Sequence, residues 1–161
     1  MVVKDIGGIV IDAVHEVFET LIFILPEESP PEDTDVSRLT GELISSIHIS
    51  GDINGIVSMV CSRKVAEMLT GNMLGTEGGE VSQEEINDCA GEIVNMVTGN
   101  IKSRFVEAGL NFLLSIPTVV SGMDLVLSFP EEVHGVRVTF LVEGEEVRFN
   151  FLYKASPALM E

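Results

Sequence analysis

The stretch that decides the fold is residues 82–109, SQEEINDCAGEIVNMVTGNIKSRFVEAG. It opens with Ser82 and has Glu85 three residues later, an arrangement called the capping box that begins many helices. Apolar residues then recur at helical spacing, and Gly109 is a residue type that commonly ends a helix. The apolar positions are Ile86, Ala90, Ile93, Val97 and Ile101. The stretch therefore predicts one helix from about Ser82 to Ala108, roughly 40 Å long.

The polar face of this helix carries Asp88, Glu92 and Asn95 in one stripe. At about 100° per residue these positions fall within roughly 60° of one another, opposite the apolar face. Any amphipathic helix has a polar outer face, so the wheel alone leaves open whether the stripe has a function. Two features favour a function. Like charges at i,i+4 mildly destabilise a helix, and Gly91 and Gly99 beside the stripe each cost up to about 1 kcal/mol relative to Ala. Both features suit a surface that an outside partner with a cationic group approaches closely.

The N-terminal half predicts another long helix, a hairpin and a short helix. Apolar residues at helical spacing predict a helix over about Lys4 to Leu25, which Pro26 ends. The acidic, proline-rich residues 26–40 are expected to form a mobile loop. Two apolar runs, Leu43–Ser50 and Ile56–Cys61, flank a turn and predict a β-hairpin. Ser62 and Gly75 then fit the N-terminal and C-terminal caps of a short helix.

The C-terminal part predicts strands joined by short turns. The strands are expected at Phe112–Ile116, Val119–Phe129, Val136–Val142 and Glu146–Tyr153, with a tight turn at Gly144 and a frayed tail at residues 155–161. Neighbouring strands joined by tight turns indicate an antiparallel sheet. The expected fold class is α+β, an antiparallel sheet covered on one face by two long helices and one short helix. A chain of 161 residues fits a single domain spanning residues 1–161.

The two long helices carry similar polar spacings, which predicts an internal repeat. Asp12, Glu16 and Glu19 in the first helix have the spacing of Asp88, Glu92 and Asn95 in the second. Strands that include a tight hairpin follow each helix. A duplication with pseudo-two-fold symmetry would explain both features.

Charge and composition exclude several classes of function. The chain has 9 Lys and Arg against 26 Asp and Glu, a net charge of −17. Such a surface repels phosphate backbones and anionic lipid, so neither a nucleic acid nor a membrane is expected as a partner. The most apolar stretch, Ile6 to Leu25, is interrupted by charges that a membrane span would exclude. Cys61 and Cys89 form no CxxC pair and no signal peptide is visible, so we expect reduced thiols in a cytoplasmic protein.

Familiar catalytic and metal-binding motifs are missing from the sequence. His15, His48 and His134 have no metal-ligand spacing, and there is no HExxH. GxSxG, P-loop and GxGxxG motifs are also absent. Glu92 and Asn95 could not form a metal site without further ligands. We therefore expect no metal site and no cofactor of the protein's own.

The segment Asp88-Cys-Ala-Gly-Glu92-Ile-Val-Asn95, with Ile116-Pro117-Thr118-Val119 after it, resembles the CheC/CheX/FliY family of bacterial chemotaxis phosphatases. The family motif is Asp or Ser, three residues, Glu, two residues, Asn, and then a proline. In the family, the proline follows the Asn at nearly the same spacing as in this chain, where 21 residues separate Asn95 from Pro117. The Ser50–Gly55 hairpin is also similar. Family members with two sites carry the motif on both long helices, whereas Glu19 stands here where the first helix would need the amide. The chain is therefore more similar to the one-site CheX type.

This resemblance implies hydrolysis of the aspartyl phosphate on a CheY-like response regulator, in chemotaxis or related two-component signalling. Asn95 would position the attacking water, because an amide can both donate to and accept from water. Glu92 would pair with a lysine of the partner, and Asp88, Gly91 and Gly99 would support docking. The Mg2+ ion would belong to the partner, and the resemblance also implies a homodimer. The alternative is a non-catalytic module that docks a receiver domain or a flagellar motor component through the same helix.

Overall fold

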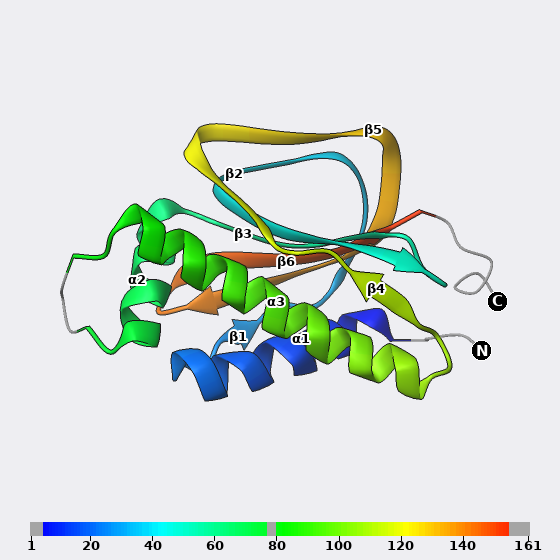
Figure 1. Ribbon diagram of the computed structural model, residues 1–161, viewed down its shortest axis with the longest axis horizontal. Coiled ribbons are helices and arrows are strands. Elements are labelled where there is room, and N and C mark those ends of the chain that lie inside the picture. The colour runs from blue at the N-terminus through cyan, green and yellow to red at the C-terminus, as the bar shows by residue number, and fades with distance from the viewer. Residues whose placement is uncertain (1–4, 77–79, 155–161) are drawn as a thin grey trace.

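The computed structural model describes residues 5–76 and 80–154, which form a six-stranded antiparallel sheet and three α-helices (Figure 1). Helices α1 (Ile6–Val17) and α3 (Gln83–Glu107) lie side by side on one face of the sheet and run in opposite directions, and α2 (Arg63–Leu74) lies at one end. The strands are β1 (Glu27–Glu28), β2 (Glu32–Gly51), β3 (Gly55–Cys61), β4 (Phe112–Leu114), β5 (Thr118–Val142) and β6 (Glu145–Tyr153). The predicted α+β class is confirmed. The tail predicted at residues 155–161 lies outside the described residues.

Local sequence signals determine both ends of α2 and the start of α3. The Ser82 Oγ accepts from the Glu85 backbone N at 3.1 Å, and the Ser82 backbone N donates to Glu85 Oε1 at 2.9 Å. This reciprocal pair is the predicted capping box. In α2, the Ser62 side chain caps the N-terminus, and Gly75 ends the helix with a φ of 70°. A positive φ is a conformation that glycine adopts at little cost.

The first helix is shorter than predicted. α1 ends at Val17, and a π-helical turn, η1 (Phe18–Ile22), carries the chain to Phe23, whose φ is 61°. The Phe18 and Ile22 side chains are fully buried, so the wider turn keeps both in the core as the helix ends. The stop therefore comes before Pro26, which the sequence indicated as the breaker.

β3 and β6 form the centre of the sheet, whose strand order is β1-β5-β6-β3-β2-β4 with all neighbours antiparallel. The predicted β2–β3 hairpin is confirmed, with Leu43 opposite Cys61 and Ile49 opposite Gly55. The predicted turn between β5 and β6 is also confirmed. Glu143 and Gly144 both have positive φ there, 50° and 80°, as a two-residue hairpin turn of type I′ requires.

β2 and β5 are longer than predicted and give the sheet its curled shape. Besides pairing with β3 and β6, they pair with each other, from Ser46 opposite Thr118 out to Glu32 opposite Arg137. This pairing closes β5, β6, β3 and β2 into a ring, visible as the cyan and yellow arch in Figure 1. The prediction of a loop over residues 26–40 is wrong for most of its length, because β1 and the first half of β2 lie there. The strands predicted at 119–129 and 136–142 are likewise two parts of one bent strand, β5.

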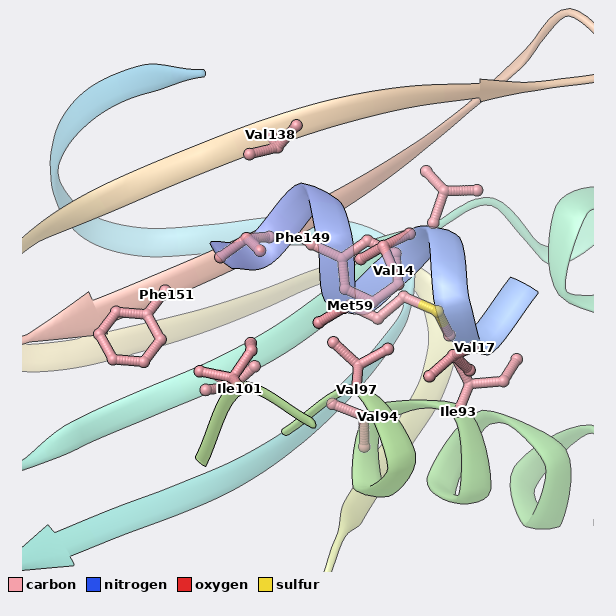
Figure 2. Close-up of a cluster of buried hydrophobic side chains, with 14 of the residues drawn as sticks. Val14, Val17, Met59, Ile93, Val94, Val97, Ile101, Val138, Phe149 and Phe151 are labelled. Carbon is pink, nitrogen blue, oxygen red and sulfur yellow. The ribbon is translucent and has the colours of Figure 1, made fainter. Parts of the chain in front are cut away.

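The main core lies between the helices and the sheet (Figure 2). Side chains of both long helices meet those of the three strands β3, β5 and β6 there: Val14, Val17, Ile93, Val94, Val97, Ile101, Met59, Val138, Phe149 and Phe151. All five positions predicted for the inner face of α3 are buried. A second, smaller core lies on the opposite face, where β2 and β5 fold over the sheet, and consists of Leu39, Ile44, Ile56, Val60, Val133 and Leu152.

The order of elements repeats along the chain. α1, β2 and β3 come in the same order as α3, β5 and β6, and the two last-named strands, β3 and β6, pair antiparallel at the centre of the sheet. This is the arrangement that the predicted internal duplication requires.

Candidate functional site

The polar stripe on α3 faces solvent. Asp88, Glu92 and Asn95 are all exposed, on the side of the helix opposite its buried face. Within residues 5–76 and 80–154, no hydrogen bond or ion pair involves these three side chains. Their carboxylate and amide groups are therefore available to a molecule that approaches from outside.

Polar contacts at its N-terminal end fix how α3 is rotated. The Gln83 Nε2 donates to Asn87 Oδ1 at 2.9 Å and to the Ser121 Oγ of β5 at 3.1 Å. Arg63 of α2 donates to the Gln83 Oε1. Together with the buried apolar face, these contacts hold the helix in one orientation on the sheet. The stripe consequently points in a fixed direction.

One flank of the stripe is formed by the segment before β5. A Cβ atom added to Gly91 would lie 3.6 Å from the Pro117 Cβ and 3.6 Å from the Val119 Cγ2. Gly91 is itself buried, so its closest neighbours belong to the same chain and not to a partner. Our expectation that an outside partner approaches Gly91 needs correction, since the space over this residue is already taken. The exposed Pro117 instead forms an apolar edge beside the stripe, and the exposed Ile116 precedes it in the chain.

The other flank of the stripe is formed by α1. The Asn100 Nδ2 donates to Glu16 Oε2 at 2.6 Å, and the Arg104 Nε donates to Asn100 Oδ1 at 3.1 Å. The Arg104 guanidinium also lies 3.8 Å from carboxylate oxygens of both Asp12 and Glu16. The single positive charge of Arg104 is therefore shared between Asp12 and Glu16, the two acidic residues of α1. Gly99 differs from Gly91, because an added Cβ would meet no atom within 4 Å.

The stripe gives α3 a negative surface that affects its neighbours. Burial raises the pKa of the Cys89 thiol, and the nearby carboxylates of Asp88 and Glu85 raise it further. Within the described ranges, no three His, Cys, Asp or Glu side chains are grouped so that they could hold a metal ion. No helix of that part of the chain is long and apolar enough to cross a membrane. What the surface can offer is a pair of carboxylates and one amide on a rigid helix.

Comparison with known proteins identifies the family. The sequence profile of the family described as "Chemotaxis phosphatase CheX" matches residues 43–141. The chain belongs to the CheX family. The CheX match begins in β2 and ends in β5, so it includes all of α3 and Pro117. The resemblance that the α3 motif indicated is confirmed.

Individual CheX proteins support the same assignment. The protein of Thermotoga maritima described as "CheY-P phosphatase CheX" is 29% identical over 117 residues, which cover 71% of this chain and 74% of that protein. The crystal structure of CheX from Desulfovibrio desulfuricans has a TM-score of 0.84 at 22% identity, covering 93% of this chain and 99% of that one. CheX in the CheX–CheY–BeF3–Mg2+ complex of Borrelia burgdorferi has a TM-score of 0.76 at 16% identity, covering 94% and 99%. The two crystal structures share the fold of this chain.

The sequence pointed to the stripe but missed its surroundings. The periodicity and the motif placed Asp88, Glu92 and Asn95 on one exposed face, as the structure has them. The contact of Glu16 with Asn100 and Arg104 was not predicted. An Asn and an Arg at i,i+4 are visible in the sequence, but only the packing of α1 on α3 brings Glu16 to them.

Proposed function

We propose that this chain is a phosphatase that removes the phosphoryl group from the aspartyl phosphate of a CheY-like response regulator, in chemotaxis or related two-component signalling. One observation carries the proposal: the region that matches the CheX family includes the stripe on α3. The three side chains of this stripe are exposed and form no hydrogen bond or ion pair with the described residues. The T. maritima relative is described as acting on CheY-P, and the B. burgdorferi CheX is bound to CheY in its crystal structure.

In this proposal Asn95 positions the attacking water. Phosphoryl transfer needs little covalent help from the enzyme, and depends mostly on a water held in line with the leaving oxygen. An amide suits this task because its oxygen accepts from the water while its nitrogen can donate to the phosphoryl group. The Asn95 side chain has both functions free among the described residues.

Glu92 docks the helix by pairing with a lysine in the partner's active site. Glu92 and Asn95 are three residues apart, so their Cβ atoms lie about 5–6 Å from each other on one face of the helix. Pairing of Glu92 with the lysine would therefore bring Asn95 close to the phosphoryl group in the partner's active site. Asp88, one turn before Glu92, adds a second carboxylate at the edge of the contact. A local cation from the partner offsets some of the repulsion between a chain of net charge −17 and a phosphorylated acidic pocket. In this scheme the Mg2+ ion is bound by the response regulator.

The test is phosphate release from a phosphorylated receiver domain loaded with Mg2+. We expect the purified chain to accelerate release, Asn95→Ala to abolish the acceleration while retaining binding, and Glu92→Ala to weaken binding. Glu19→Ala serves as the control, because Glu19 is exposed, does not lie on α3 and forms no hydrogen bond or ion pair with the described residues. If Asn95→Ala accelerates phosphate release as much as the native chain does, the proposed mechanism is refuted. Binding by the native chain without acceleration would identify a non-catalytic docking module instead.

We further propose that the protein is a cytoplasmic homodimer and that residues 1–161 form one domain. The dimer proposal is supported by exposed apolar side chains on the arch, where Met123 is 87% exposed and Val126 is 56% exposed. Two copies that join through this surface would remove both from water. Light scattering tests the proposal, and a monomeric mass at micromolar concentration would contradict it.

A further inference from the structure

Three arginines line one pocket on the face of the sheet that carries no helix. Arg137 of β5, Arg148 of β6 and Arg38 of β2 border a pocket of about 260 Å3, together with Leu39, Thr40, Val60 and Asn150. The whole chain has only 9 Lys and Arg and a net charge of −17. A third of the cationic side chains therefore gather at one place in a strongly acidic protein.

A chain of polar contacts holds the Arg137 side chain in position. Its Nε donates to Asn150 Oδ1 at 2.8 Å, and the Asn150 Nδ2 donates to the Ser58 Oγ at 3.2 Å. Asn150 is 1% exposed and Ser58 is 0% exposed, so this support lies inside the protein. Because the Nε is used by Asn150, the two Nη groups are the donors that remain for the pocket. A guanidinium fixed in this way loses little side-chain entropy when it binds a ligand.

The positive charges of the pocket are poorly balanced by the described residues. Burial lowers the pKa of Arg137, the nearby charge of Arg148 lowers it further, and only Glu32 acts in the opposite direction. Neither Arg148 nor Arg38 forms a hydrogen bond or ion pair with any residue whose side chain is described. Arg137 of β5 lies opposite Asn150 of β6, and Arg148 comes two residues before Asn150 on β6. Like charges at such diagonal positions are about 7–8 Å apart between Cα atoms, close enough to repel.

Three of the cations outside the pocket already have acidic partners. Lys64 lies 2.8 Å from Glu145, Arg63 lies 3.0 Å from Glu67, and Arg104 lies between Asp12 and Glu16. Lys102 of α3 forms no such pair with the described residues, so the pocket is distinguished by three cations that gather at one place without an ion pair to a described carboxylate. This gathering indicates that the three arginines of the pocket are placed for an anion that comes from outside the chain.

We propose that this pocket binds a compact phosphate dianion, held by Arg38, Arg137 and Arg148. Guanidinium groups bind oxyanions through paired, charge-assisted hydrogen bonds. A small ligand fits better than an acidic polypeptide, because Glu42, Glu145 and Glu146 line the adjoining hollow that Arg148 also borders. These carboxylates would repel an extended acidic chain but leave the pocket itself positive. The pocket is on the opposite face from α3, so this proposal does not depend on the phosphatase function.

Calorimetric titration of the full chain in a chloride buffer tests the proposal. Inorganic phosphate, pyrophosphate and adenosine monophosphate are the three probes, which distinguish a free anion from the phosphate group of a nucleotide. We expect saturable binding of one anion per chain for at least one probe. Arg148→Ala and Arg38→Ala should each weaken it by about tenfold or more. Arg63→Ala removes the same charge from α2 and should leave the affinity unchanged.

A second measurement locates the bound anion. Nε–H resonances of Arg137 and Arg148 should shift on titration in NMR spectra, while that of Arg63 should not. Arg148→Gln replaces Arg148→Ala if the alanine variant fails to fold, and phosphate release from a receiver should be unchanged in either. The proposal is overturned if none of the three probes binds saturably. Equal weakening by Arg148→Ala and Arg63→Ala would also overturn it, since that result indicates a general effect of charge.

Discussion

Two fully buried serines in the sheet should respond oppositely to the same substitution. Ser45 of β2 is 0% exposed, and its Oγ has no hydrogen-bond partner in the part of the chain that the structure describes. A buried hydroxyl without a partner costs about 1–3 kcal/mol, because water bound it in the unfolded chain. Ser45→Ala removes this cost and only one atom of packing. We therefore expect the free energy of unfolding to rise by about 1 kcal/mol.

Ser58 of β3 is the matched control for Ser45. It is also 0% exposed, but its Oγ accepts from the Asn150 Nδ2 at 3.2 Å. Ser58→Ala leaves this amide buried without its acceptor, so the free energy of unfolding should fall by about 1–3 kcal/mol. Strand propensity enters both substitutions alike and does not contribute to the difference between them.

Urea unfolding followed by circular dichroism measures both variants against the parent chain. The slopes against urea should agree, so that the midpoints report stability alone. The reasoning is refuted if Ser45→Ala destabilises the protein as much as Ser58→Ala does. That result would mean that the Ser45 hydroxyl has a partner, such as a bound water, that stabilises the fold.

Three further predictions concern α3, α1 and the cysteines. Gly99→Ala should stabilise the fold by up to about 1 kcal/mol, since nothing lies within 4 Å of the added Cβ, yet weaken receiver binding; unchanged affinity would remove Gly99 from the docking surface. A hydrogen bond from His15 lowers the pKa of the Glu28 carboxyl. A carboxyl whose pKa is lower in the folded than in the unfolded chain stabilises the fold at pH values above its unfolded pKa, and this stabilisation is lost as the pH falls through its folded pKa. Glu28→Gln should therefore lower the melting temperature at neutral pH but not well below pH 4.5, whereas a difference independent of pH would contradict this account. Burial and Glu42 raise the pKa of Cys61 to about 12, and burial and Asp88 raise that of Cys89, so both thiols should react with a disulfide reagent only after unfolding; rapid reaction of the native protein would count against this.

The elements predicted well are those whose signals are local. The capping box of Ser82 and Glu85 and the apolar spacing of α3 each act within a few residues, and the structure reproduces both. The exposed stripe follows from the same spacing, because a helix with one buried face must turn its other face outward. The roles of Asp88, Glu92 and Asn95 in catalysis and docking stay predictions that the variants above test.

The features that were missed depend on residues far apart in the chain. Residues 26–40 read as a loop because their acidic and proline-rich composition is unfavourable for a strand, and only β5 supplies the partner that makes β2 extend so far. The neighbours of Gly91 were misjudged for a similar reason, since Pro117 reaches it through the fold. Helix periodicity likewise gives no sign of the π-helical turn at Phe18–Ile22, where burial of two side chains sets the geometry.

The pairing of β2 with β5 has a consequence for how the protein is made. β2 ends at Gly51, but β5, the strand that pairs with the first half of β2, ends only at Val142, and β6 comes after β5. On the ribosome the first hairpin emerges long before either partner strand, and closing so long a loop costs entropy and slows folding. Until then the hairpin presents unpaired backbone to other nascent chains. Glu32 and Asp33, which begin β2, place negative charge on this edge, and charge of this kind opposes edge-to-edge aggregation.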